Sequence, residues 1–191
     1  MEALKNRILA DGQAVGKDIV KVDSFLNHQI DAEFMYEIGE EFRKRFTDAE
    51  ITKILTIEAS GIAIAVCTAK SFDYPPVVFA KKAAPITMVE GFYSTSAKSF
   101  TKDEIIEIII AKKYISPGDK ILVIDDLLAY GESTLALCSL AEQAGAQIVG
   151  VGVVIEKEFQ GGGTRLREKG YNLQALAVIE KIENGQILFK E

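Results

Sequence analysis

The spacing of apolar and polar residues predicts strands that alternate with helices along most of the chain. Short runs of apolar, largely β-branched residues predict buried strands, and longer segments with apolar residues every three or four positions predict helices. The clearest strands are expected at 53–57, 77–79, 121–124 and 147–155, with helices at 62–72 and 133–144. This alternation is typical of an α/β fold with a mainly parallel central sheet.

The segment between the first two predicted helices has an unusual mixture of residues. Apolar positions in residues 2–10 predict a short helix that stops at Gly12, and Asp31 is placed to cap a second helix over residues 32–46. Between them, residues 15–30 interleave apolar side chains with aspartate, asparagine, histidine and glutamine. A segment that only packed against a core would need fewer polar groups, so we expect this one to contribute to a site.

Two hairpins and one glycine-rich connection are predicted elsewhere in the chain. Residues 93–115 are expected to form a β-hairpin after a mobile loop that begins at residue 83, although 104–112 is also compatible with a helix. Asn184-Gly185 predicts the turn of a C-terminal hairpin. The run Gly161–Gly163 predicts a flexible connection, because it lacks the spacing of a dinucleotide-binding fingerprint.

The stretch from Ile121 to Thr134 carries the strongest chemical signal. Its apolar strand is expected to end at two adjacent carboxylates, Asp125 and Asp126, and a loop through Gly131 leads into the next helix. A strand that turns into a helix N-terminus directs backbone N–H groups at one point, which suits a phosphate. The carboxylates would repel a phosphate, so they suit ribose hydroxyls or a divalent cation. The stretch therefore predicts a phosphorylated ribose; the alternatives are a solvated strand end, a capping pair or an acidic metal site.

Residues elsewhere offer groups for a second anion and for a heterocyclic base. Ser60 and Gly61 lie at a strand-to-helix turn whose backbone amides suit a second phosphate, although a tight connection that needs small residues also explains them. Asn27 offers a donor and an acceptor together, as the edge of an oxo-purine requires. Lys157, at the end of a predicted strand, is either a donor to such a base or an ordinary surface lysine.

Composition narrows these possibilities. The chain has 191 residues, 48% of them hydrophobic and 26% charged, so a single domain over residues 1–191 is expected. The formal net charge of −6 argues against nucleic acid as a general partner. Because no long apolar run is present, we expect neither a signal peptide nor a membrane-spanning helix. Cys67 and Cys138 lie in apolar helical patterns, which favours free thiols in a reduced, cytoplasmic protein.

The stretch Ile121–Thr134 resembles the motif with which type I phosphoribosyltransferases bind 5-phosphoribosyl-1-pyrophosphate (PRPP). That motif is an apolar strand, Asp-Asp, a few small or apolar residues, glycine and a hydroxyl residue, and this stretch matches it throughout. Within that family, the chain resembles the xanthine phosphoribosyltransferases over residues 1–5, 20–31, 56–62 and 155–160. The resemblance implies an α/β fold whose mainly parallel sheet is flanked by helices, with a flexible hairpin hood that closes over PRPP.

The resemblance also implies purine salvage, in which the 5-phosphoribosyl group passes from PRPP to xanthine and gives xanthosine 5′-monophosphate and pyrophosphate. Charge develops on the ribose and on the departing pyrophosphate, so Mg²⁺ is expected, mainly through PRPP. A homodimer is implied as well, with residues 1–30 and the C-terminal segment contributing a base-binding hood. The alternatives are a guanine or hypoxanthine phosphoribosyltransferase and a non-catalytic, PRPP-sensing regulator of the same fold.

The implied site residues are carried over by their positions in the motifs, and none is assigned as a direct metal ligand. Asp125 and Asp126 are assigned to catalysis at the ribose hydroxyls, and Lys81 to the pyrophosphate. The other PRPP-binding residues are Ala129, Tyr130, Gly131, Glu132 and Ser133 in the loop and Ser60 and Gly61 in the earlier turn, and the xanthine-binding residues are Val20, Asn27 and Lys157. Two positions depart from the family pattern: Tyr130 replaces asparagine, and Lys81-Lys82 replaces Arg-Lys, which exchanges a bidentate fork for a point charge.

Overall fold

Strands and helices alternate along the computed structural model, which describes residues 1–82, 91–99 and 104–190. The strands are β1 (Gln13–Val15), β2 (Ile19–Lys21), β3 (Lys53–Ile57), β4 (Val77–Ala80), β5 (Phe92–Ser99), β6 (Glu104–Ala111), β7 (Lys120–Leu128), β8 (Gln147–Lys157), β9 (Leu173–Glu183) and β10 (Gln186–Phe189). The helices are α1 (Glu2–Asp11), α2 (Ala32–Arg45), α3 (Ser60–Ser71), α4 (Glu132–Gln143) and α5 (Gly162–Glu168), with short helical turns η1 (Asp23–Asn27), η2 (Lys112–Tyr114) and η3 (Glu158–Gln160).

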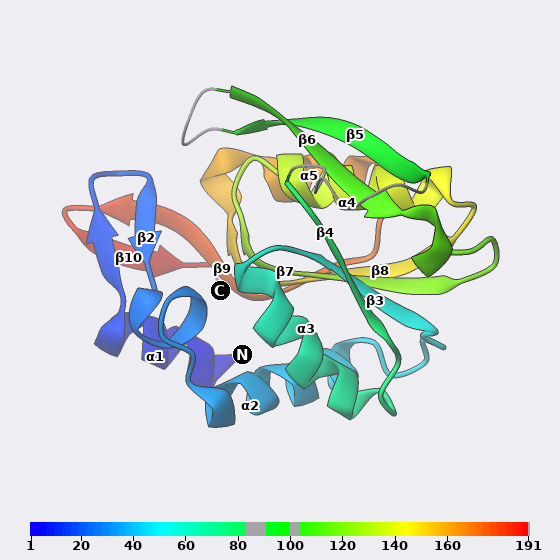
Figure 1. Cartoon of the computed structure of the whole chain (residues 1–191). Helices are drawn as coiled ribbons and strands as arrows, with labels where there is room; N and C mark the ends of the chain where they lie inside the picture. Colours follow the sequence, from blue (N-terminus) through cyan, green and yellow to red (C-terminus); the bar gives the residue numbers. More distant parts are fainter. Residues whose placement is uncertain (83–90, 100–103, 191) are drawn as a thin grey trace.

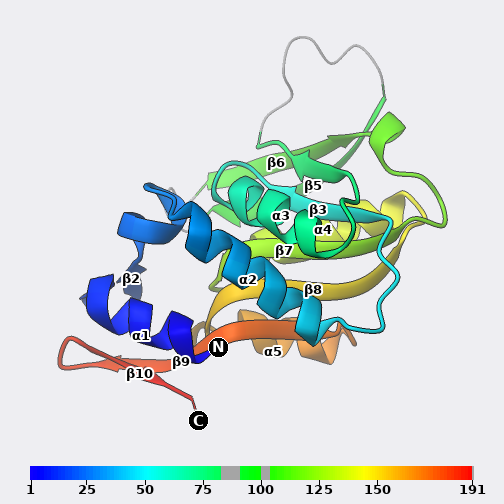
Figure 2. The same cartoon turned by 90° about the horizontal axis from the view of Figure 1, so that it is seen from below.

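A six-stranded sheet in the order β10-β9-β8-β7-β3-β4 forms the centre of the fold. Its neighbouring strands pair in parallel, except for the antiparallel pair β9–β10. Helices α2 and α3 cover one face of the sheet, and α4 and α5 cover the other (Figures 1 and 2). The predicted α/β fold with a mainly parallel sheet flanked by helices is therefore confirmed.

The residues of β7 alternate between two apolar clusters, one on each face of the sheet. Leu122 and Ile124 pack with Phe42 of α2, whereas Ile121 and Val123 belong to the cluster that α4 covers. Strand residues point alternately to opposite faces, so a β-branched run can supply both layers. Burying each such side chain contributes about 1.5–3 kcal/mol, which holds β7 firmly in the middle of the sheet.

Several predicted elements are confirmed almost to the residue. The first helix ends before Gly12, and the Asp31 side chain caps α2 by accepting a hydrogen bond from the Phe34 N–H at 3.2 Å. The C-terminal hairpin turns at Asn184 and Gly185, as predicted. Cys67 and Cys138 are free thiols. Among the described residues, no helix has both the length and the apolar character that crossing a membrane requires.

The predicted hairpin after the first βαβ unit is formed by β5 and β6. The two strands pair antiparallel from Phe92 opposite Ala111 to Ser99 opposite Glu104, so the alternative of a helix over 104–112 is wrong. The hairpin lies above α4 (Figure 1), and Ile108 and Ile110 of β6 belong to the same apolar cluster as Leu137 of α4. The predicted mobile loop at residues 83–90 lies outside the described residues.

Two expectations about the sheet's carboxyl edge are wrong. Strand β7 does not end at Asp125 but continues to Leu128, because β8 runs alongside it and pairs Asp125 with Val153 and Leu127 with Ile155. Nor is Gly161–Gly163 a flexible connection. Gly162 and Gly163 are buried in the first turn of α5, where their missing side chains allow close backbone packing.

Candidate active site

The loop that follows β7 presents the N-terminus of α4 at the carboxyl edge of the sheet. Gly131 is the N-cap of α4, and its φ of +84° is a left-handed conformation that favours glycine. Helix α4 begins at Glu132, so the N–H groups of Glu132, Ser133 and Thr134 belong to its first turn. Such N–H groups have no partner within a helix and carry partial positive charge, which makes this end of α4 suited to an anion.

A pocket of about 190 Å³ opens in front of this loop. All five residues predicted to bind PRPP in the loop line it, together with two lysines and apolar residues of β6 and β7: Lys82, Lys98, Ile106, Leu127, Leu128, Ala129, Tyr130, Gly131, Glu132, Ser133 and Thr134. The lining combines a helix N-terminus with two positive side chains, as a phosphate or pyrophosphate would require. A larger pocket, of about 310 Å³, lies beside Thr52 and Pro75, before β3 and β4, and holds none of the predicted site residues.

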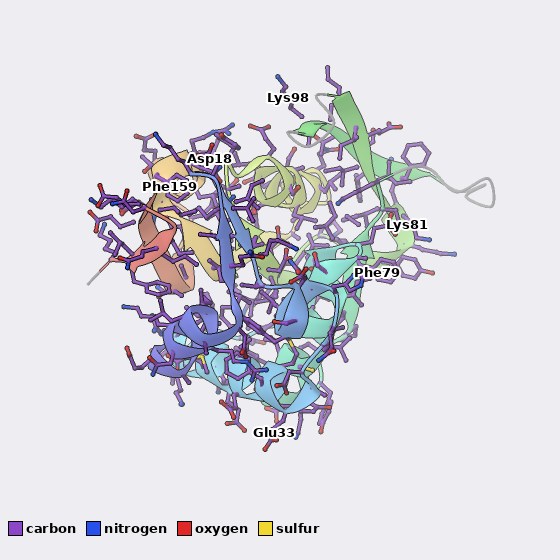
Figure 3. The ribbon with its side chains drawn as sticks, turned by 90° about the vertical axis from the view of Figure 1, so that its left-hand side faces the viewer. Asp18, Glu33, Phe79, Lys81, Lys98 and Phe159 are labelled. Carbon is purple, nitrogen blue, oxygen red and sulfur yellow. The ribbon has the colours of Figure 1, made fainter. Side chains whose placement is uncertain are left out.

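The structure brings Lys82 and Lys98 to this pocket rather than Lys81. The Lys81 Nζ lies 5.8 Å from the centre of the Phe79 ring, and both side chains lie at one edge of the molecule (Figure 3). Its backbone forms a bridge with Ile109 of the hairpin. Sequence reasoning missed Lys82 and Lys98. The Lys-Lys pair offered a signal for Lys82, whereas Lys98 approaches the pocket only because the hairpin folds back over α4.

Asp125 and Asp126 make different contacts, because successive residues of a strand point to opposite faces. The Asp125 carboxylate accepts hydrogen bonds from the Asp126 N–H at 3.0 Å and from the Thr134 Oγ1 of α4 at 3.4 Å. Burial, and then the charge of Asp126, raise the pKa of Asp125 well above its usual range. The Asp126 Oδ2 instead accepts a hydrogen bond from the Asn27 Nδ2 at 3.1 Å.

The second predicted anion turn, Ser60 and Gly61, forms the beginning of α3. It follows a cis peptide between Glu58 and Ala59. A Cβ at Gly61 would stand 2.1 Å from Thr56 Oγ1 and 3.7 Å from Asp125 Oδ1, so only glycine fits so close to β3. This turn therefore lies beside the buried aspartate, although it is not part of the pocket lined by the α4 loop.

The residues predicted to bind a base come from the N-terminal segment and from the end of β8. Asn27 ends η1 and reaches Asp126, a residue 99 positions away in the sequence. The Lys157 Nζ donates to the Asp18 carbonyl at 2.9 Å, and burial lowers the pKa of Lys157. Asp18 lies at the tip of the β1–β2 hairpin, and Val20 is a buried residue of β2. Two contacts thus join this hairpin and η1 to the carboxyl ends of β7 and β8.

Comparison with known proteins agrees with this geometry. The phosphoribosyl transferase domain family matches residues 24–174. The xanthine phosphoribosyltransferases of Clostridium novyi and Clostridioides difficile are each 50% identical to the chain over 190 residues, which covers 100% of both partners. That of Moorella thermoacetica is 50% identical over 189 residues, covering 99% of this chain and 96% of its own length.

Solved structures of adenine phosphoribosyltransferases share the fold. The protein from Rhodothermus marinus has a TM-score of 0.74 at 23% identity, covering 93% of this chain and 99% of its own. The protein from Saccharomyces cerevisiae has a TM-score of 0.74 at 18% identity, covering 92% of this chain and 99% of its own. These likenesses establish the type I phosphoribosyltransferase fold for this chain. With the full-length relatives and the match over residues 24–174, they show that the chain belongs to the phosphoribosyl transferase family.

Proposed function

We propose that this chain transfers the 5-phosphoribosyl group of PRPP to xanthine, forming xanthosine 5′-monophosphate and pyrophosphate in purine salvage. One observation carries the proposal: the hydrogen bond between Asn27 and Asp126 joins a base-reading amide to the end of the strand that leads into the phosphate loop. A ribose bound beside Asp126 would have its 5′-phosphate at the α4 N-terminus and its C1 towards the base. Full-length relatives that are about half identical bear the name of this activity.

The loop Ala129–Ser133 is proposed to hold the 5′-phosphate by its backbone N–H groups and by the positive end of α4. Backbone N–H groups can bind a phosphate whichever side chain their residue carries, so Tyr130 can replace the asparagine of the family pattern. Ser60 and Gly61, with Lys81, remain our proposal for the pyrophosphate. Lys82 and Lys98 extend this proposal, because both line the pocket in front of α4.

Catalysis is proposed to rest on charge placed around the ribose rather than on a nucleophile. The C1–O bond to pyrophosphate breaks, and a purine nitrogen bonds to C1 as its proton is released to water, so positive charge develops on the ribose in the transition state. The Asp126 carboxylate would accept hydrogen bonds from ribose hydroxyls and stabilise that charge. The Asp125 carboxylate already accepts hydrogen bonds from the Asp126 N–H and the Thr134 Oγ1, so we assign it a narrower part, which is to hold those two groups in place.

The base is proposed to lie between Asn27 and Lys157, with Val20 beneath it. The Asn27 amide offers a donor and an acceptor to the purine edge, and the Lys157 ammonium donates to a ring carbonyl. An amino group in the place of that carbonyl would face a like donor, which disfavours adenine. The N-terminal residues 1–30 and the C-terminal segment would then form a hood over the base.

Mg²⁺ is proposed to arrive with PRPP. Among residues 1–82, 91–99 and 104–190, no three His, Cys, Asp or Glu side chains come together at one point. Mg²⁺ is a hard cation that prefers oxygen ligands and is commonly bound through substrate phosphates, so we propose that the phosphates of PRPP supply most of its ligands. When bound, it neutralises charge on the departing pyrophosphate. We further propose a cytoplasmic homodimer.

Pyrophosphate release tests the proposal directly. The purified chain is mixed with Mg²⁺ and PRPP, with and without xanthine, and pyrophosphate is followed over time. We expect release that needs both substrates and that the Asp126→Asn variant nearly abolishes, whereas Asp48→Ala, at an exposed position, behaves as the wild type. Binding of PRPP without any turnover would support the regulator instead.

A further inference from the structure

Helix α5 packs directly against the loop that is proposed to hold the 5′-phosphate. The Gly162 N–H donates to the Ala129 carbonyl at 3.0 Å. A Cβ at Gly162 would stand 2.4 Å from that carbonyl oxygen and 2.6 Å from the Gly131 nitrogen. The two backbones therefore touch, and the first turn of α5 forms a wall behind the phosphate loop.

One side chain of α5, Arg165, reaches into the same loop. Its Nη1 donates to the Tyr130 carbonyl at 2.6 Å and to the Glu132 Oε1 at 2.5 Å. Both acceptors belong to the five-residue stretch proposed to bind the 5′-phosphate. The side chain of Arg165 is 46% exposed and that of Glu132 is 29% exposed, so the pair lies at the rim of the site rather than in the core.

The two acceptors of Arg165 are groups that a phosphate would avoid. A carboxylate in the first turn of α4 repels an incoming anion, and a carbonyl that turned into the pocket would present a negative end to it. The Arg165 guanidinium neutralises the Glu132 carboxylate and holds the Tyr130 carbonyl towards α5. Both contacts come from one nitrogen, Nη1, which carries two N–H donors and so can serve both acceptors.

Helix α5 is itself anchored, so Arg165 is presented from a fixed position. The Arg167 Nη1 and Nη2 donate to the Glu156 Oε1 and Oε2, both at 2.7 Å. Glu156 is 1% exposed and precedes Lys157, the residue proposed to contact the base. This bidentate pair fastens α5 to the end of β8, close to both halves of the site.

We infer that Arg165 is a positioning residue for PRPP, which neutralises Glu132 and fixes the Tyr130 carbonyl so that the phosphate loop is ready for an anion. The inference rests on the proposed function, because it names what prepares that same site. It places Arg165 outside the reacting atoms. Its removal should therefore affect the affinity for PRPP and spare the chemical step.

Calorimetric titration with Mg²⁺-PRPP and steady-state kinetics test this inference. Arg165→Ala should raise the Kd and KM for PRPP about tenfold, since it removes a charge-assisted contact that solvent partly screens. The kcat and the KM for xanthine should stay within about twofold. Arg165→Lys should restore part of the affinity. In the Arg165→Ala background, Glu132→Gln should restore most of it, because the unpaired carboxylate is then gone.

Arg43→Ala is a matched control, because Arg43 also donates from its Nη1 to two oxygen atoms, the backbone carbonyls of Phe46 and Thr47, which are not part of the candidate site. It should leave PRPP affinity unchanged. Wild-type affinity in Arg165→Ala, or no recovery when Glu132→Gln is added, would overturn the inference while the proposed function stood. A wild-type chain that does not bind Mg²⁺-PRPP would overturn the proposed function, and the inference with it.

Discussion

The loop proposed to bind phosphate (the phosphate loop) and the residues proposed to read the base are built in opposite ways. The phosphate loop, residues 129–133, is one continuous stretch whose useful groups are backbone N–H groups at the start of α4. The base-reading residues are side chains from two distant parts of the chain, Asn27 in η1 and Lys157 at the end of β8. The contact between Asn27 and Asp126 is the point at which the two regions meet.

This difference explains what each region can tolerate. A phosphate is recognised by geometry that glycine and helix ends supply, so Tyr130 is compatible with the loop while a Cβ at Gly162 is not. A purine is recognised by a pattern of donors and acceptors, so the identity of each side chain decides it. We therefore expect substitutions in the two regions to affect different kinetic constants.

The largest effect is expected where the regions meet. Asp126→Ala should lower kcat about 10²–10³-fold, because it removes the charge that stabilises the developing positive ribose. Initial rates at saturating Mg²⁺-PRPP and xanthine measure this. Rates like those of the wild type would remove Asp126 from the catalytic assignment and would leave the two regions unconnected.

A backbone substitution behind the phosphate loop should come next. Gly162→Ala places a Cβ 2.4 Å from the Ala129 carbonyl, so the loop must move. We expect kcat/KM for PRPP to fall about a hundredfold, since a displacement of that size disturbs the binding geometry. Gly91→Ala is the control, because its nearest neighbour would be 3.5 Å away. Equal values of kcat/KM for PRPP in both variants would show that the packing of α5 against the phosphate loop does not affect PRPP binding.

A substitution at the proposed base site should change the kinetic constants for xanthine more than those for PRPP. Asn27→Ala should raise the KM for xanthine about tenfold and weaken selectivity among purines, because a polar contact to the ring is lost. The KM for PRPP should change less. Parallel titrations of both substrates, with Asn6→Ala as a surface control, measure the split. Unchanged constants for every base would remove Asn27 from the base site.

The smallest effect concerns stability. Burial raises the pKa of Asp125 well above its usual range, so this carboxyl holds a proton more readily in the folded chain than in the unfolded chain. Stability therefore falls as pH rises from the unfolded towards the folded pKa. Asp125→Asn removes this cost and should raise Tm at neutral pH by about 2–4 °C, the shift that 1 kcal/mol produces in a chain of this size. The gain should vanish in acid; a gain independent of pH would contradict this account.

Local patterns were enough to predict most elements and the turn through Gly131 into α4, because each depends on neighbouring residues. Asp31 caps α2 as expected, and Gly131 leads into α4 as expected. The extension of β7 through Asp125 could not be predicted, since it depends on pairing with β8, and the approach of Lys98 depends on how the hairpin folds. The run Gly161–Gly163 was misinterpreted as a flexible connection. Glycine is required at position 162 because the Ala129–Gly131 backbone packs against it, and that contact exists only in the folded chain.

Competition among purines tests the central claim most directly. The chain is given PRPP, Mg²⁺ and equal amounts of xanthine, guanine, hypoxanthine and adenine, and the nucleotide products are separated and quantified. We expect xanthosine 5′-monophosphate to predominate and adenosine 5′-monophosphate to be negligible. A mixture led by another nucleotide would contradict the base assignment of Asn27 and Lys157, and the absence of any nucleotide would contradict the proposed transfer itself.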